Sequence, residues 1–221
     1  MNLFNLENKF LQSLSKITDC MILSVLWLIA SLPIVTIGAS TTALYYTVNK
    51  VFYNDRGNNW SEFWNAFAQN FKQSTIMWSI LLVLYGFIVW DAFILFQLAK
   101  TGNPMGQLYY LILLLIVLLA MWSGYWFPYV ARFSAPTTVV LKNAVYIAIF
   151  HFMRTILLFL LLVLTVAGFF VMPFYIIFLP ALYMIFANKI LEKIFEKYMT
   201  TEDLEKERQR NGKEASCHRS D

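Results

Sequence analysis

The carboxyl-terminal half of the chain contains a long stretch without any charged residue, from Thr155 to Asn188. As one helix, rising 1.5 Å per residue, it would reach roughly 50 Å, whereas the hydrocarbon core of a bilayer is about 30 Å thick. A break is therefore needed. Gly168 and Pro173 supply it, because proline suits the first turn of a new helix. The stretch predicts two hydrophobic segments, at about 145–167 and 172–187.

The composition excludes an ordinary soluble domain. Apolar residues make up 59% of the 221 residues and charged residues 14%, against roughly half and a quarter in soluble domains. A soluble fold of this size has too much surface to hide so many apolar side chains. Eight of the seventeen basic residues follow Asn188. That placement is typical of a basic cytoplasmic edge rather than of a nucleic-acid-binding surface.

Three further hydrophobic segments precede this stretch, at about 20–46, 75–98 and 108–127. The first is interrupted by Pro33 and Gly38, so it is either a kinked crossing or a re-entrant hairpin. We therefore expect an all-α, polytopic transmembrane bundle of about five segments. It forms a single domain over residues 1–200, and the charged tail 201–221 is expected to be disordered.

Amphipathic helices accompany these segments. Residues 2–17 carry apolar side chains at helical spacing, which is typical of an interfacial helix. Aromatic residues recur on one face between residues 60 and 71, and Asn59 can cap that helix with Glu62 three residues later. After residue 187 the helical pattern continues through Tyr198 with lysines on one face.

The distribution of positive charge predicts the orientation. With five crossings and a cytoplasmic carboxyl terminus, only Lys9, Lys16 and Lys100 lie outside. With a re-entrant first segment, both termini are cytoplasmic and only Lys100 lies outside. We favour five crossings, because the seventeen uncharged residues from Met21 to Ile37 approach a spanning length. Both alternatives place the carboxyl terminus in the cytoplasm.

Polar residues within the hydrophobic segments are candidates for a binding site. Asp91 lies inside the segment 75–98, and His151 and Arg154 lie one turn apart in the segment 145–167. Such residues usually face the interior of a bundle and have a partner, so we hypothesise an Asp91–Arg154 pair with His151 beside it. The alternative is an interfacial acid and a base that reaches the interface separately.

The interrupted first segment is a second candidate. Pro33 and Gly38 break a helix at membrane depth, where the freed backbone groups need partners. The hydroxyls of Thr36, Ser40 and Thr41, with that of Thr42, can supply them. In transporters such breaks often line binding sites. Alternatively, the hydroxyls stabilise a kink that only shapes the bundle.

No pattern indicates an enzyme. The sequence has no phosphate-cradling glycine loop, no metalloprotease helix motif and no nucleophile elbow. The two cysteines, Cys20 and Cys217, lie at opposite ends of the chain, and His151 and His218 are also far apart. We expect no catalytic residue, no metal and no cofactor.

Three motifs carry a family resemblance. They are Leu32–Tyr45 (LPIVTIGASTTALY), the run with Phe63, Phe67 and Asn70–Ser74, and Pro128–Phe133. Together they resemble the YesL-like family of bacterial integral membrane proteins over Leu3 to Lys197. The resemblance implies a plasma-membrane protein of unassigned activity, whose relatives are often encoded near sugar-binding and permease components of carbohydrate uptake. It carries over no catalytic residues.

These observations favour an accessory or regulatory membrane protein associated with carbohydrate uptake. The alternative is a small permease that uses the broken first segment and the intramembrane polar residues. The expected partners are the lipid bilayer and either membrane transport components or further copies of the chain, with no nucleic acid.

Overall fold

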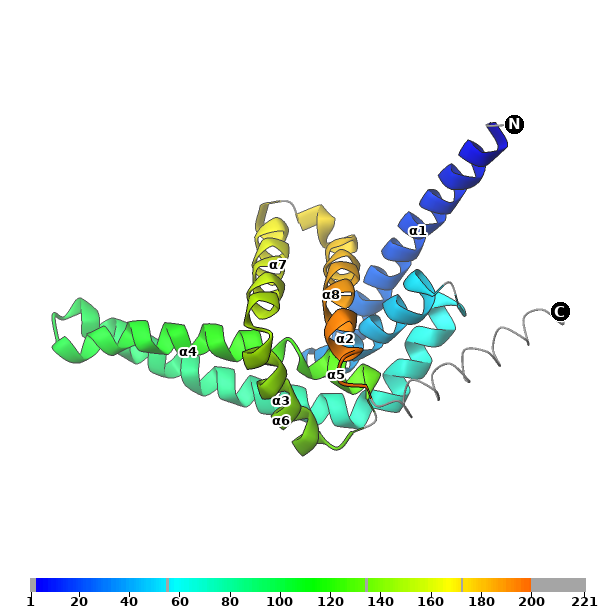
Figure 1. Cartoon of the computed structure of the whole chain (residues 1–221). Helices are drawn as coiled ribbons and strands as arrows, with labels where there is room; N and C mark the ends of the chain where they lie inside the picture. The colour runs from blue at the N-terminus through cyan, green and yellow to red at the C-terminus, as the bar shows by residue number, and fades with distance from the viewer. Residues whose placement is uncertain (1–2, 55, 134, 172, 200–221) are drawn as a thin grey trace.

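The computed structural model describes residues 3–54, 56–133, 135–171 and 173–199, with side chains from residue 15 onward. All regular structure in this part of the chain is helical, which confirms the all-α prediction. The predicted tail 201–221 lies outside the described residues. The helices are α1 (Leu3–Ala30), η1 (Ile34–Thr36), α2 (Ile37–Thr47), η2 (Val48–Tyr53), α3 (Asn59–Lys100), η3 (Pro104–Gln107), α4 (Leu108–Ser123), α5 (Trp126–Arg132), α6 (Thr137–Phe150), α7 (Phe152–Val171), η4 (Pro173–Ile177) and α8 (Leu179–Phe195) (Figure 1).

The first hydrophobic segment is a helical hairpin. Helix α1 ends at Ala30, and α2 begins after a short turn that contains Pro33. Across the hairpin, the Trp27 indole nitrogen donates to the Thr41 hydroxyl at 3.2 Å. The segment is therefore two helices folded against each other, and the alternative of a kinked first helix is not confirmed.

Helix α3 is one continuous helix of 42 residues. The sequence analysis divided it into an aromatic helix and a separate hydrophobic segment, but no proline interrupts it and Gly86 is its only glycine. The capping prediction was off by one residue, because Asn58 is the N-cap and its side-chain oxygen accepts from the Trp60 amide at 3.0 Å. The Asn59 side chain reaches α1 instead.

The predicted segment 145–167 is wrong in its boundaries. The chain breaks at His151, which separates α6 from α7. The hydroxyl of Thr155 donates to the carbonyl oxygens of Ala148 and His151, at 3.0 and 3.2 Å, so it stabilises this break. Helix α7 then continues through Gly168 to Val171, so the turn toward α8 lies later than predicted.

Within the described residues, three helical stretches are long and apolar enough to cross a membrane: Asn59–Lys100, Pro104–Arg132 and Phe152–Val171. The count of five segments is therefore not confirmed. Figure 1 shows α3 and α4 side by side, extending away from the other helices. The large apolar side chains on this extension are widely exposed, including Phe87 at 69% and Trp90 at 66%. An apolar surface of this extent is typical of contact with lipid.

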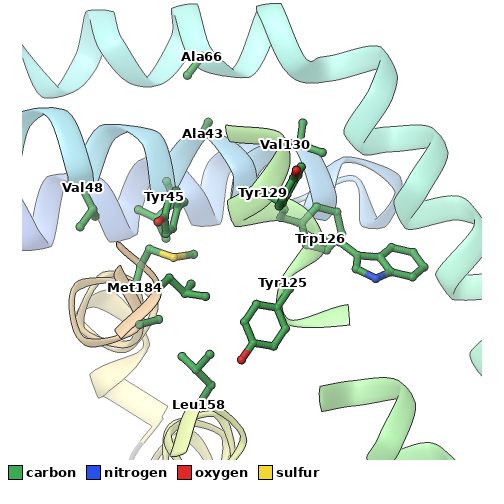
Figure 2. Packing of buried hydrophobic residues seen from close by; sticks show 14 of the residues in the cluster. Ala43, Tyr45, Val48, Ala66, Tyr125, Trp126, Tyr129, Val130, Leu158 and Met184 are labelled. Carbon is green, nitrogen blue, oxygen red and sulfur yellow. The ribbon is translucent and has the colours of Figure 1, made fainter. Parts of the chain in front are cut away.

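The core is built around α2. Ala39, Ala43, Leu44 and Tyr45 are buried within it, and α3, α5 and α8 all contact this helix. Figure 2 shows Ala43 and Tyr45 of α2 near Tyr129 and Val130 of α5 and Met184 of α8. The α2 part of the motif Leu32–Tyr45 thus lies at the centre of the fold.

Candidate functional site

The hydroxyls near the break in the first segment bond to the protein itself. The Thr36 hydroxyl lies 2.6 Å from the carbonyl oxygen of Ala30 and 2.7 Å from that of Pro33. The hydroxyls of Ser31 and Ser40 are 2.6 Å apart across the hairpin. The freed carbonyl groups at the end of α1 therefore have partners within the fold, as helix ends require.

Two further hydroxyls of the motif hold α2 to its neighbours. The Thr41 hydroxyl donates to the carbonyl oxygen of Ile37 at 2.7 Å while it accepts from Trp27. The buried Thr42 and Ser74 hydroxyls lie 2.8 Å apart and so join α2 to α3. These contacts are those expected if the hydroxyls stabilise the break and shape the bundle, rather than line a binding site.

Gly38 lies at the closest approach between α2 and the helices that cover it. A Cβ atom at this position would lie 2.6 Å from the Ser74 carbonyl oxygen and 2.7 Å from the Trp78 Cβ. It would also lie 2.8 Å from the ring of Phe127 in α5. Small residues allow helix backbones to approach this closely. Only glycine fits here without displacing α3 or α5.

Asp91, His151 and Arg154 are not brought together. Asp91 is exposed on α3. The Arg154 guanidinium donates to the Lys193 carbonyl oxygen at 3.3 Å, and no ion pair joins Arg154 to Asp91 among the described residues. His151 packs against Tyr198 with 5.7 Å between the ring centroids. The hypothesised pair is therefore absent from this structure, and a binding role for each residue stays a prediction.

A polar cluster that the sequence analysis missed joins three helices. The Tyr45 hydroxyl of α2 donates to Glu192 Oε1 of α8 at 2.8 Å. Arg132, at the end of α5, places Nη2 3.3 Å from the other carboxylate oxygen, Glu192 Oε2. Tyr45 is 1% exposed, and the Arg132 and Glu192 side chains are 14% and 16% exposed.

Aromatic rings pack beside the buried Tyr45 side of this cluster. The Phe195 ring lies edge-on to Tyr45, with 6.4 Å between the centroids, and edge-on to Tyr129 at 5.9 Å. Burial raises the pKa of Tyr45 well above its ordinary value, and the nearby Glu192 carboxylate raises it further. The phenol therefore remains a proton donor at neutral pH, while Arg132 balances the carboxylate charge.

The cluster connects α2, α5 and α8 through the side chain of Glu192. One carboxylate is neutralised by one guanidinium and accepts a hydrogen bond from one phenol. The sequence contained part of the signal, because Arg132 lies in the motif Pro128–Phe133, but it did not indicate a partner for this residue. In the described part of the chain, no three histidine, cysteine, aspartate or glutamate residues lie close enough together to hold a metal ion.

The close packing at Gly38 can be tested with a matched glycine. Gly38→Ala should destabilise the protein by about 1–3 kcal/mol, because the added methyl group forces helices apart. Gly86→Ala in α3 is the control, since a Cβ there meets nothing within 4 Å. Thermal unfolding in detergent, followed by tryptophan fluorescence, measures both. Equal melting temperatures for the two variants would contradict the assignment.

The polar cluster can be tested at its carboxylate. Glu192→Ala should cost about 3 kcal/mol of stability, because it leaves the nearly buried Arg132 charge without this carboxylate. Tyr45→Phe should cost about 1 kcal/mol, as expected for one hydrogen bond. The control is Glu196→Ala, which removes an exposed carboxylate one turn later. Chemical or thermal unfolding in detergent ranks the three variants, and a Glu192→Ala variant as stable as the control would refute the role.

Comparison with known proteins gives one match. Residues 20–92 match the family model described as "Protein of unknown function, DUF624". A search of curated proteins and a search of solved structures found no match. The matched range includes α2 and its contacts with α3, but it ends before α4 and before the motif Pro128–Phe133. The similarity to this family of unknown function thus lies in the stretch that contains the end of α1, all of α2 and most of α3.

Proposed function

We propose that the protein is an accessory or regulatory component of the plasma membrane, associated with carbohydrate uptake, and that it neither transports a solute nor catalyses a reaction. The observation that carries this proposal is the close packing at Gly38. The pocket of about 370 Å³ beside Thr41 and Leu44 of α2 is lined mostly by apolar side chains, so it offers no polar path. At Gly38 there is no room for even a methyl group, and the hydroxyls of the broken segment bond to the fold itself.

A permease that used the broken segment would need a polar path beside it. The packing of α2 against α3 and α5 leaves no such path at Gly38. Asp91 is exposed on the outside of α3, so the polar residues of the two candidate sites do not border one cavity. These features favour an accessory role over the permease alternative.

The hairpins of the structure support a topology in which both termini are cytoplasmic. Helix α8 contacts α7 and α4 contacts α3, and each pair is joined by a short turn. If α3 and α7 cross the bilayer outward, α4 and α8 bring the chain back to the cytoplasmic side. The α1–α2 hairpin likewise returns to its own side. This topology places Lys100, at the turn between α3 and α4, outside the cell. The other turns that carry lysine lie inside, which agrees with the positive-inside rule.

The association with carbohydrate uptake rests on the resemblance of the chain to the YesL-like family. Exposed side chains offer surfaces for partners at the cytoplasmic level of this topology. Trp60 and Phe71 of α3 are 59% and 40% exposed, and Lys189 and Lys193 are exposed on α8. Aromatic and basic side chains of this kind suit the membrane interface and protein partners there.

The functional proposal predicts an inactive protein in isolation. Reconstituted alone in proteoliposomes, the chain should take up no labelled mono- or oligosaccharide above empty vesicles. After mild extraction from cells grown on inducing sugars, it should copurify with a carbohydrate transport component. Sugar uptake by the pure protein would establish the permease alternative. Copurification with no transport component would contradict the accessory role.

The topology predicts the location of reporters. A reporter fused before Met21 and one fused after residue 199 should both be cytoplasmic. A reporter inserted at Gly102, in the turn between α3 and α4, should be outside. If the reporter before Met21 lies outside while the carboxyl-terminal one is cytoplasmic, the first segment crosses the membrane and the hairpin topology is wrong.

A further inference from the structure

A groove with one polar end runs along α1. Its volume is about 830 Å³, and the loop before α3 and the start of that helix form its opposite wall. The α1 side is apolar and includes Ile22, Val25 and Ile29, which are 39%, 40% and 49% exposed. Asp19, Asn59 and Trp60 line the other end. The groove is therefore amphipathic along its length.

The polar end has hydrogen-bond acceptors without matching donors. The Asn59 amide nitrogen donates to Asp19 Oδ1 at 2.6 Å. That contact is the one polar interaction of the Asp19 side chain within the described residues, and no ion pair balances its charge there. The Asn59 side chain is 7% exposed, and its carbonyl oxygen has no donor. A buried acceptor without a donor is unfavourable.

Negative charge and surplus acceptors favour a ligand group that is positive and donates hydrogen bonds. An alkylammonium group meets both conditions, whereas a neutral hydroxyl meets only the second. The exposed indole of Trp60 stands at the same end, and aromatic faces attract cations. The apolar wall next to this end fits a hydrocarbon chain.

We propose that this groove binds one membrane lipid with a primary ammonium headgroup, its chain lying along Val25 and Ile29 of α1. The inference rests on the proposed membrane location of the protein. The ammonium group would lie at Asp19, held in place by Asn59.

The test uses the full chain in lipid nanodiscs that contain equal amounts of phosphatidylethanolamine, phosphatidylcholine and phosphatidylglycerol. Native mass spectrometry then identifies the lipid retained after release from the disc. The wild-type protein should retain one phosphatidylethanolamine with a preference on the order of tenfold, since a charged hydrogen bond contributes about 1.5–3 kcal/mol. Phosphatidylcholine has the charge without N–H donors, and phosphatidylglycerol has donors without the positive charge.

Two variants separate the headgroup contact from the chain contact. Asp19→Asn should abolish the preference among the three lipids, and Val25→Trp should abolish retention altogether by filling the groove. Asp91→Asn and Val83→Trp are the matched controls, because both residues are exposed on α3 and neither lines the groove. The controls should retain the lipid as the wild type does.

The outcomes distinguish this inference from the proposed function. Equal retention of the three lipids by the wild type, or an unchanged preference in Asp19→Asn, would overturn the lipid site. Each variant is also checked for carbonate-resistant association with cell membranes. If the wild-type protein is washed from membranes, the membrane function itself fails. If it stays while lipid selectivity is absent, only the lipid site fails.

Discussion

The contact between α2 and α3 at Gly38 is the constraint on which the rest of the structure depends. Because a glycine faces the Ser74 carbonyl and the Trp78 side chain, α2 packs against α3 with no room for a Cβ atom at this position. The Thr42 and Ser74 hydroxyls, 2.8 Å apart, join the same two helices. Helix α5 closes over the same glycine through Phe127, and α8 joins α5 and α2 through the carboxylate of Glu192. The close packing at Gly38 thus positions α2 and α5 so that Tyr45 and Arg132 both reach Glu192 of α8.

This arrangement bears directly on function. A broken helix in a membrane protein can line a path for a solute, or it can be a solid support for other helices. Here the Thr36 hydroxyl bonds to the Ala30 carbonyl oxygen. The Ser40 hydroxyl bonds to the Thr36 carbonyl oxygen and to the Ser31 hydroxyl. The polar groups of the break are therefore bonded within the fold. A larger groove lies along α1, where its shape and polarity suit a lipid rather than a passing solute. The smaller pocket beside Thr41 and Leu44 of α2 is mostly apolar. The site proposed for a ligand is therefore on the outside of the hairpin.

Sequence patterns located the apolar segments well but divided them incorrectly. Asn59–Lys100 is one helix because nothing in it stops propagation, although its character changes from aromatic and polar to wholly apolar. No proline or glycine marks the break at His151 in the sequence. The break is stabilised by the Thr155 hydroxyl, which bonds to the carbonyl oxygens of Ala148 and His151. The hypothesis of an Asp91–Arg154 pair has a related weakness. Hydropathy gives depth in a membrane but not the direction in which a helix face points.

The sequence by itself determined that the chain has long helical stretches apolar enough to cross a membrane, because a soluble fold of this size cannot hide so many apolar side chains. It also singled out the motif from Leu32 to Tyr45 as unusual. Only the tertiary structure decided what that motif does, since the role of Gly38 depends on Ser74, Trp78 and Phe127. Tyr45, Arg132 and Glu192 lie far apart in the chain, and Asp19 is far from Asn59. Their meeting depends on how helices pack, which local sequence patterns do not encode.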